Sequence, residues 1–541
     1  TFTTGLQYMQ SMAALGDGGF LVTWASDNQD GSGMGVYGQC YSAAGSPNGA
    51  EFRINTTTSN GQMQPVAASL ANGGFVVVWQ SYSQDVSGTY GLYGQRYSSS
   101  GQMAGSEFRV NTFVNGDQTR QAVTALTGGG FVVAWESSTQ DGSGYGVYSQ
   151  CYSSSGQAIG GEIQLDTVAA SDQLTVRLAA LGDGGYVAVW LSMLQDGSSY
   201  GIFARRFSSA GVPAGNEFRV NTYTASDQNN PVVTKLADGG FVVAWTSYGQ
   251  DAANTLGIYG QRYSVTGAAV GGEFRVNTTT ASDQYQPALT ALTDGGFVVT
   301  WTSPDAGGMG VYAQRYSSTS AAVGSETRIN TYTSGDQNLS QVLALDDGGY
   351  AVTWKSNLQD GGGLGVYARA VTSTYWEGGS GADVITGNSA NETLAGLAGN
   401  DTLDGGAGND TLIGGVGNDT YVMRQGNGAD IIDNHTEGNS GDLLQVGSGV
   451  SRDQVWFAHQ GNDLIVSIIG TSDSAKVADW YLSSANHVST IRTNDGAVLA
   501  DAAVENLVAA MAQMAPPPAG QTQLTTQQHQ QLDGIIAANW H

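Results

Sequence analysis

The stretch NNPVVTKLADGGFVVAWTSYGQDAANTLGIYGQRYSVTGAAVGGEFRVNT, residues 229–278, contains one complete unit of a repeat. Its turn signals, which are DGG, a QD-containing loop and TGAAVGG, leave four short runs: PVVTKL, GFVVAW, GIYGQRYS and GEFRVNT. Short runs rich in β-branched and aromatic residues, bounded by such turns, are typical of β-strands. The unit therefore predicts four strands and leaves little place for a helix.

The unit recurs along the first two thirds of the chain. A tryptophan closes each GFVVAW-like run, and successive tryptophans lie 53 to 56 residues apart. They are Trp24, Trp79, Trp135, Trp190, Trp245, Trp301 and Trp354. Seven units of four short strands predict a seven-bladed β-propeller, in which both faces of each blade are buried. A linear β-solenoid or a string of small sandwiches is the alternative.

The last run of the unit occurs six times, against seven tryptophan runs. The copies are EFRINT (51–56), EFRVNT (107–112), EIQLDT (162–167), EFRVNT (217–222), EFRVNT (273–278) and ETRINT (326–331). We therefore expect a seventh blade of three strands, with Thr1 placed where its fourth strand would just have ended. That strand comes either from sequence upstream of Thr1 or from a neighbouring molecule, because an unpaired strand edge is a template for another chain.

Composition limits the partners. The formal net charge is −27 and the chain has only three lysines, so we expect divalent cations rather than nucleic acid as partners. No apolar run is long enough for a membrane span, and the N-terminus lacks the pattern of a secretory signal. Cys40 and Cys151 occupy the same place in two repeats, where a disulfide is out of reach, so we expect both to be unpaired.

A second repeat, with a period of nine, follows the first. Residues 378–422 read GGSGADVIT, GNSANETLA, GLAGNDTLD, GGAGNDTLI and GGVGNDTYV. Calcium takes six to eight oxygen ligands, and glycine lets a backbone turn tightly enough to direct carbonyls at it. We therefore expect a calcium site. Its candidate residues are Asp383, Asp401, Asp410 and Asp419, with Gly379, Gly381, Gly399, Gly406, Gly408, Gly415 and Gly417.

A flexible Gly/Asp-rich linker is the alternative for this run. An apolar residue recurs at the eighth position of each copy, which predicts a core stripe that a linker would not need. These residues are Ile385, Leu394, Leu403, Leu412 and Tyr421.

The run resembles the RTX calcium-binding nonapeptide, GGxGxDxUx. The resemblance implies a calcium-binding β-roll in which turns two repeats apart face each other, so that Asp383 pairs with Asp401 and Asp401 with Asp419. The second copy departs from the pattern, because it has Glu392 in place of Asp and lacks two glycines. Residues 435–499 look like the small β-rich domain that follows RTX turns, which caps the roll.

The tail is similar to the uncleaved C-terminal export signal of RTX proteins that use the type I route. It predicts an amphipathic helix, a break at the prolines and a second helical stretch. We thus expect an all-β chain with a propeller (1–375), an RTX roll (376–434), a β-rich cap (435–499) and a helical secretion signal (500–541).

The propeller repeats offer few candidates for catalysis. All five histidines, His435, His459, His487, His529 and His541, follow the repeats. Acids that recur in every unit indicate turn chemistry rather than a catalytic pair. One set, in QDGSG-like loops, is Asp30, Asp85, Asp141, Asp196, Asp251, Asp305 and Asp360; a second calcium set or ligand-contacting loops are the alternative for it. The other, followed by Gln, is Asp117, Asp172, Asp227, Asp283 and Asp336; these cap strand starts or form a polar ring at the channel mouth.

The propeller units resemble repeats of large secreted bacterial adhesin-like proteins. We therefore expect a secreted, extracellular or cell-surface protein that is stabilised by Ca²⁺ and has no catalytic activity. It self-assembles into a filament or surface layer, with strand donation at the seventh blade as the mechanism. The alternatives are a lectin-like module that binds cell-surface glycans and a secreted enzyme that acts on polysaccharide.

Overall fold

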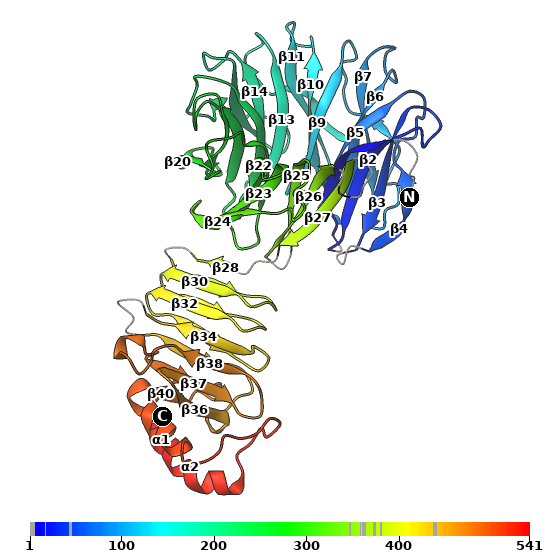
Figure 1. Cartoon of the computed structure of the whole chain (residues 1–541). Coiled ribbons are helices and arrows are strands. Elements are labelled where there is room, and N and C mark those ends of the chain that lie inside the picture. The colour runs from blue at the N-terminus through cyan, green and yellow to red at the C-terminus, as the bar shows by residue number, and fades with distance from the viewer. Residues whose placement is uncertain are drawn as a thin grey trace. The chain divides into compact units, whose positions relative to one another are not determined.

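The structure is a computed structural model that describes residues 6–16, 18–42, 46–345, 348–357, 359, 364–371, 375–378, 381–435 and 441–541. The chain forms two compact units, one made mostly of the tryptophan repeats and the other mostly of Ala370–His541. Figure 1 shows both units.

The first unit is a seven-bladed β-propeller, as the repeats predict. Its sheets follow one another in chain order. The first three are β1 (Gln7–Ala14), β2 (Phe20–Asp27), β3 (Met34–Tyr41) and β4 (Pro47–Arg53); β5 (Gln62–Ser69), β6 (Phe75–Tyr82), β7 (Tyr90–Tyr97) and β8 (Phe108–Arg109); and β9 (Gln118–Ala125), β10 (Phe131–Ser138), β11 (Tyr145–Tyr152) and β12 (Ala158–Gln164).

The remaining blades have the same order of strands. They are β13 (Gln173–Ala180), β14 (Tyr186–Met193), β15 (Tyr200–Phe207) and β16 (Phe218–Arg219); β17 (Gln228–Lys235), β18 (Phe241–Tyr248), β19 (Leu256–Tyr263) and β20 (Ala269–Arg275); β21 (Tyr285–Ala291), β22 (Phe297–Asp305), β23 (Gly308–Tyr316) and β24 (Ala322–Arg328); and β25 (Gln337–Ala344), β26 (Tyr350–Asn357) and β27 (Leu364–Val371). Among the described residues the seventh sheet has three strands and the other six have four, as the repeat count predicts.

In the second to sixth blades both faces of the second strand are buried, which explains why these strands are mostly apolar. In β6, Val77 and Trp79 pack with Leu21 of the first blade. Val76 and Val78, on the opposite face, pack with the third blade. Trp79, Trp135, Trp190, Trp245 and Trp301 are fully buried, and Trp354 nearly so, which confirms a core role for these side chains.

The ring closes between the seventh and first blades, but this seam differs from the others. Gln341 Nε2 of β25 donates to the backbone oxygen of Gln10 in β1 at 3.4 Å. Trp24, unlike its five fully buried counterparts, remains partly exposed. Across the seam, the alternate residues of β26 include Thr353 and Lys355, which are also partly exposed. This contact is therefore less apolar than those between the other blades.

The second unit is a β-roll of two sheets (Figure 1). One sheet has the order β28 (Tyr375–Glu377), β30 (Thr393–Ala398), β32 (Thr411–Val416), β34 (Ala429–Asp433), β38 (Ser474–Val477), β37 (Asp463–Ile468) and β36 (Val455–Gln460). The other has the order β29 (Val384–Thr386), β31 (Thr402–Asp404), β33 (Thr420–Met423), β35 (Leu443–Val446), β39 (Thr490–Arg492) and β40 (Val498–Ala500). Strands that follow the nonapeptide run therefore extend the sheets that the run begins.

The nonapeptide strands pair in parallel with the strand two repeats further on. Ile385 lies opposite Leu403, and Leu394 opposite Leu412. These residues and Tyr421 are buried in one continuous core, so the core stripe predicted from the eighth position is confirmed.

The tail forms α1 (Asp501–Met511) and α2 (Thr526–Asn539), separated by a segment that contains Pro516–518. Leu507 and Leu532 are buried in the same core as the roll. Among the described residues, no helix has both the length and the apolar character needed to cross a bilayer.

Candidate calcium-binding site

The acids at the sixth position of each turn form a ladder. The backbone N–H of Asp383 donates to Asp401 Oδ1, and that of Asp401 donates to Asp419 Oδ1, both at 2.8 Å. On the alternate turns, the N–H of Glu392 donates to Asp410 Oδ1 at 2.8 Å. The structure thus links the turns two repeats apart that the resemblance pairs, through one oxygen of each carboxylate.

The second oxygen of these carboxylates has no partner. Asp401 Oδ2, Asp410 Oδ2, Asp419 Oδ2 and Glu392 Oε1 are buried without a hydrogen bond to any described residue. An ionised carboxylate only accepts hydrogen bonds, and burying one without a donor or a cation is costly. These orphaned oxygens therefore fit a bound cation.

Backbone carbonyls lie close to the same positions. A Cβ placed on Gly378 would stand 2.7 Å from both Asp383 Oδ2 and the carbonyl oxygen of Gly396. Among the described residues, no three His, Cys, Asp or Glu side chains cluster closely enough to hold a metal by themselves. Carbonyl oxygens would therefore have to complete the coordination of a cation bound here, and Ca²⁺ accepts such ligands.

The glycines explain how the turns approach each other. Gly399, Gly408 and Gly417 have φ of 136°, 148° and 152°, and Gly406 and Gly415 have φ of 84° and 97°. A side chain at Gly408 or Gly417 would collide with the carbonyl oxygen of the turn two repeats earlier. Only glycine tolerates both the conformation and the contact. Gly381 is exposed with open space around it, and Gly379 lies outside the described residues.

Burial controls the electrostatics of the ladder. It raises the pKa of Asp401 and Asp410, and it raises the pKa of Asp419 to about 6, with the charges of Asp442 and Asp401 adding to the effect. A raised carboxyl pKa means that the folded roll disfavours the ionised form. A divalent cation would remove that penalty.

Two further acids extend the ladder beyond the tandem run. The N–H of Asp410 donates to Asp430 Oδ1 at 3.0 Å, and that of Asp419 donates to Asp442 Oδ1 at 2.7 Å. Both side chains are buried, and burial raises the pKa of Asp430 to about 7. Sequence reasoning missed them because their separations of 20 and 23 residues break the spacing of 18. The signal was present in GNGADII (426–432), which keeps the Gly, Asp and Ile positions of the repeat.

The recurring acids of the propeller brace turns and join blades. Asn111 Nδ2 donates to Asp85 Oδ2 at 3.0 Å, within one blade. The N–H of Tyr90, at the start of β7, donates to Asp117 Oδ1 of the next blade at 3.0 Å. Asp172, Asp227, Asp283 and Asp336 accept in the same way from the blade before them. These acids do cap strand starts, but the prediction was wrong about which strand: each caps the third strand of the preceding blade, and not the innermost strand that follows it.

One buried acid in the ring has no counterpart in the other blades and was missed. Glu136 stands where the second blade has Gln80, and it is 2% exposed. Its Oε1 accepts from the N–H of Thr175 at 2.5 Å and lies 3.6 Å from Arg120 Nη1. Burial raises its pKa. These contacts cap a backbone N–H of the fourth blade, which is a structural role.

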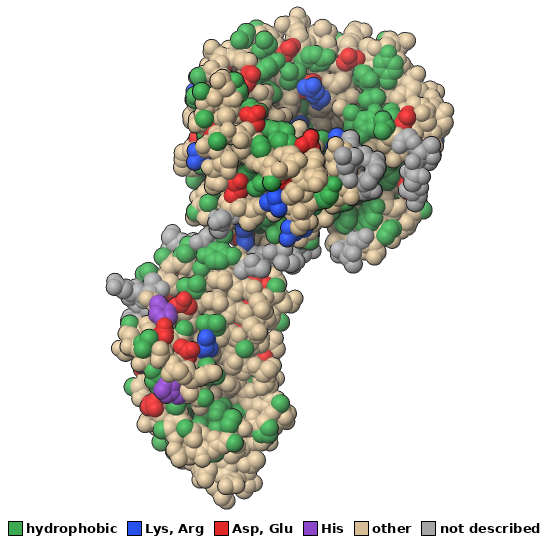
Figure 2. Space-filling view, viewed as in Figure 1, with side chains coloured by type: hydrophobic (Ala, Val, Ile, Leu, Met, Phe, Trp, Pro, Cys, Tyr) green, Lys and Arg blue, Asp and Glu red, His purple; other side chains and the backbone are tan. Residues whose placement is uncertain are grey.

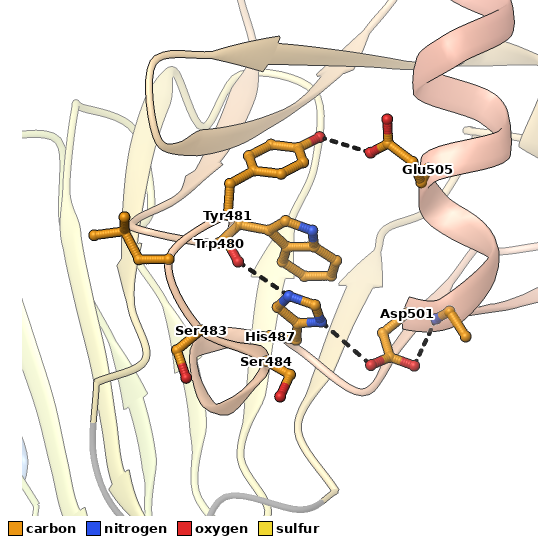
Figure 3. A pocket seen from close by; sticks show the side chains of 9 residues that line it. Trp480, Tyr481, Ser483, Ser484, His487, Asp501 and Glu505 are labelled. Atoms are coloured by element: carbon orange, nitrogen blue, oxygen red, sulfur yellow. Dashed lines mark hydrogen bonds and ion pairs between the residues drawn. The ribbon is translucent and has the colours of Figure 1, made fainter.

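A pocket of about 400 Å³ in the second unit contains a histidine, two serines and acids (Figure 3). His487 stacks on Trp480, with Nε2 at 3.0 Å from the carbonyl oxygen of Trp480 and Nδ1 at 3.3 Å from Asp501 Oδ2. A nitrogen that faces a carbonyl must carry a proton, so Nε2 cannot take one from Ser483 or Ser484. This arrangement does not make a catalytic triad.

The histidines that are visible on the surface lie in the second unit, next to acidic side chains (Figure 2). His435, also in the second unit, has Nε2 at 2.9 Å from Asp479 Oδ2. Among the described residues, Cys40 and Cys151 form no disulfide, as their positions in the repeats predict.

The fold and the ladder together define a propeller protein with a calcium-binding β-roll. Residues 377–391 and 386–421 match the RTX calcium-binding nonapeptide repeat, and residues 463–503 match the haemolysin-type calcium binding protein related domain. The chain therefore carries RTX, hemolysin-type repeats, which are calcium-binding and are typical of secreted proteins.

Several solved structures are similar to this chain at low identity. A Dyadobacter fermentans protein of unknown function is 10% identical with a TM-score of 0.39, over 57% of this chain and 93% of its own. An ulvan lyase is 9% identical with a TM-score of 0.43, over 68% and 96%. A Penicillium chrysogenum α-L-arabinanase is 16% identical with a TM-score of 0.39, over 55% and 88%. Likeness at this level says nothing about activity.

Proposed function

We propose that this protein is a secreted, calcium-stabilised structural or adhesive protein whose copies associate through an added strand at the seventh blade. The observation that carries the proposal is the exposure of Val366 in β27, which is 61%. Its counterparts in the six complete blades are fully buried. They are Val36, Leu92, Val147, Ile202, Ile258 and Val311.

In the complete blades the fourth strand covers this position. Ile54, which follows β4, joins Leu21 and Val36 in the buried cluster between the first two blades. The next residue, Asn55, accepts from the N–H of Val36 through Oδ1 at 2.7 Å. A fourth strand thus supplies both an apolar side chain and a hydrogen-bond partner to the third strand, and both would serve Val366.

A glutamate of the fourth strand joins neighbouring blades. Glu107 Oε2 accepts from the backbone N–H and the hydroxyl of Thr56 in the preceding blade, both at 2.7 Å. Its Oε1 accepts from Gln84 Nε2 of its own blade at 2.9 Å. Thr331 and Gln359 occupy the equivalent places around the seventh blade. The side chains that would bind the glutamate of an added EFRVN-type segment are therefore already present around the seventh blade.

The occupant that we propose is an EFRVN-type segment of a second copy of this protein. The six such segments between Glu51 and Thr331 lie in their own blades, so the donating copy must either release one of them or carry another outside these residues. Addition of a strand to an exposed edge provides backbone hydrogen bonds for affinity. Head-to-tail donation produces a filament or layer when the rotation between copies does not close.

Peptide binding tests the edge directly. A labelled peptide with the sequence AVGGEFRVNT (269–278) should bind the protein, measured by fluorescence anisotropy in millimolar calcium. The matched control carries Glu273→Ala and should bind about 10- to 100-fold more weakly, because it loses hydrogen bonds to a charged group. Equal binding of the two peptides, or none, contradicts the proposed edge.

Self-association is tested separately by light scattering across a concentration series in millimolar calcium. The average mass should rise with concentration, and excess AVGGEFRVNT peptide should lower it. A protein that stays monomeric throughout contradicts the proposed assembly.

A further inference from the structure

The third blade breaks a pattern that the other complete blades share. In those blades an Asn follows the fourth strand, and its NH₂ group lies among oxygen acceptors. Asn111 Nδ2 is 3.0 Å from Asp85 Oδ2, 3.1 Å from Gln118 Oε1 and 2.9 Å from the carbonyl oxygen of Phe113. The corresponding Asn–Asp contacts are Asn55 with Asp30, Asn221 with Asp196 and Asn277 with Asp251.

In the third blade this Asn is replaced by Asp166, which is 4% exposed. Asp166 Oδ1 accepts from the N–H of Val147 at 3.1 Å, which is the contact that Asn Oδ1 makes elsewhere. Asp141 also keeps the common position, because its Oδ2 lies 2.8 Å from where a Cβ on Gly146 would stand. A second carboxylate oxygen therefore takes the place that belongs to an NH₂ group in the other blades.

The oxygens that would receive that NH₂ are left without donors. Gln173, the counterpart of Gln118, is fully buried, and its Oε1 has no partner among the described residues. Asp141 Oδ2 is likewise buried and unpartnered; Asp305 Oδ2 of the sixth blade is also unpartnered, but it lies 3.8 Å from Arg328 Nη1. The indole N–H of Trp190 also lacks a partner, so it does not serve Gln173. An unpaired buried acceptor requires a donor or a cation.

In the third blade a neutral side chain also replaces an arginine near these acids. In the second blade Arg109 Nη1 lies 3.8 Å from Asp85. The counterpart of Arg109 is Gln164, which is neutral and donates to Asp166 Oδ2 at 2.9 Å. Among the described residues, no Lys, Arg or His forms an ion pair with Asp141 or Asp166. Burial raises the pKa of Asp166 to about 6, and the charge of Asp141 adds to this.

We propose that Asp141, Asp166 and Gln173 bind a divalent cation of the calcium type between the third and fourth blades. The carbonyl oxygen of Val168, the counterpart of Phe113, is a further ligand by position. All these ligand atoms are hard oxygens, which Ca²⁺ prefers, and water molecules complete a coordination number of about six to eight. A divalent ion balances both carboxylates, whereas one shared proton balances only one.

Hydrogen exchange of the full chain, with and without calcium, tests this site. Peptides that contain residues 140–147 and 164–174 should exchange more slowly in calcium. The slowing should reach about 100-fold when calcium is at 100 times its Kd, since local opening must release the ion. The equivalent peptides of the fourth blade, 195–202 and 219–229, should not respond. The roll serves as the positive control that calcium is bound.

Asp166→Asn is the matched variant, because it restores the residue that five other blades carry. It should fold normally and lose the calcium response of the third blade, while the roll keeps its own. A wild-type third blade that does not respond to calcium, or a response that persists in Asp166→Asn, overturns the proposal.

Discussion

The backbone N–H of Asp383 donates to one carboxylate oxygen of Asp401, and the other oxygen of Asp401 is buried with no partner. The same arrangement recurs along the nonapeptide turns. Each carboxylate is thus held in place by the backbone while half of its acceptor capacity remains open. The geometry explains both why the turns stack and why they require a cation.

Removal of calcium at neutral pH should unfold the roll and leave the propeller folded. Without the cation, the buried oxygens of Asp401, Asp410 and Asp419 lack donors, and the charge of Asp401 acts unfavourably on Asp419. Hydrogen exchange in excess chelator should show rapid exchange across residues 383–433 and retained protection of the strands that carry Trp79 to Trp301. Unchanged protection of the roll would contradict the assigned site.

In the absence of calcium, the stability of the roll should fall as pH rises. The folded pKa values of Asp419 and Asp430 are about 6 and about 7, above the ordinary value of 3.8. Because the folded state binds more protons than the unfolded state between these values, the free energy of unfolding decreases from about pH 4 to about pH 7. Urea titrations across this range provide the measurement. Saturating calcium should reverse the trend, since the ion binds the ionised form.

Asp419→Asn should weaken calcium binding by the roll. The variant keeps a side-chain oxygen for the N–H of Asp401 but removes the charge that faces the cation. The expected loss is about 10-fold or more in affinity by titration calorimetry, equivalent to about 1.4 kcal/mol. Asp533→Asn, at a side chain that is 63% exposed on α2, is the control and should bind as the wild type does.

Gly417→Ala should destabilise the roll even in saturating calcium. Its φ of 152° is unfavourable for alanine, and the added Cβ would meet the carbonyl oxygen of Gly399. A cost of about 1 to 3 kcal/mol or more is expected from strain at such a position. Gly449→Ala is the comparison, because it also has positive φ but open space around it. An equal loss of stability in both variants would contradict a role for the close contact between Gly417 and the carbonyl oxygen of Gly399.

Trp135→Ala should destabilise the propeller more than Trp24→Ala. Trp135 is fully buried between blades, whereas Trp24 is partly exposed at the seam. Truncation of a buried Trp costs about 3 to 5 kcal/mol. Thermal unfolding of the two variants gives the comparison.

Addition of AVGGEFRVNT peptide should raise the melting temperature of the wild-type protein, because it fills the seventh blade.

The two periodicities made most of the fold predictable. A spacing near 55 residues places one tryptophan in each blade, and a spacing of nine places Leu394, Leu403 and Leu412 in one core. The seventh blade was predicted to have three strands because the EFRVN-type run occurs six times and the tryptophan run seven times. Such counting works because each repeat folds into one structural unit whose boundaries lie in turns.

What the sequence did not predict lies where a contact joins different units or where the period breaks. Asp117 caps a strand of the preceding blade, and no local pattern indicates which blade it reaches. Asp430 and Asp442 were missed because insertions shift them from the period of nine. Asp166 differs from Asn by one atom group, and its effect is visible only beside Asp141 and Gln173.

The ladder also has a direction. Each turn presents its N–H to a carboxylate that lies further along the chain, and the last described links run from the N–H groups of Gly426 and Gly428 to Asp473, beside β38. An anchored rung orients the acceptor for the turn before it, and that turn can then capture its own ion. The nonapeptide turns should therefore become ordered one after another from the hydrophobic C-terminal strands towards Asp383, against the direction of the chain. A substitution near Asp473 would then weaken ion binding at turns with which the substituted residue makes no contact.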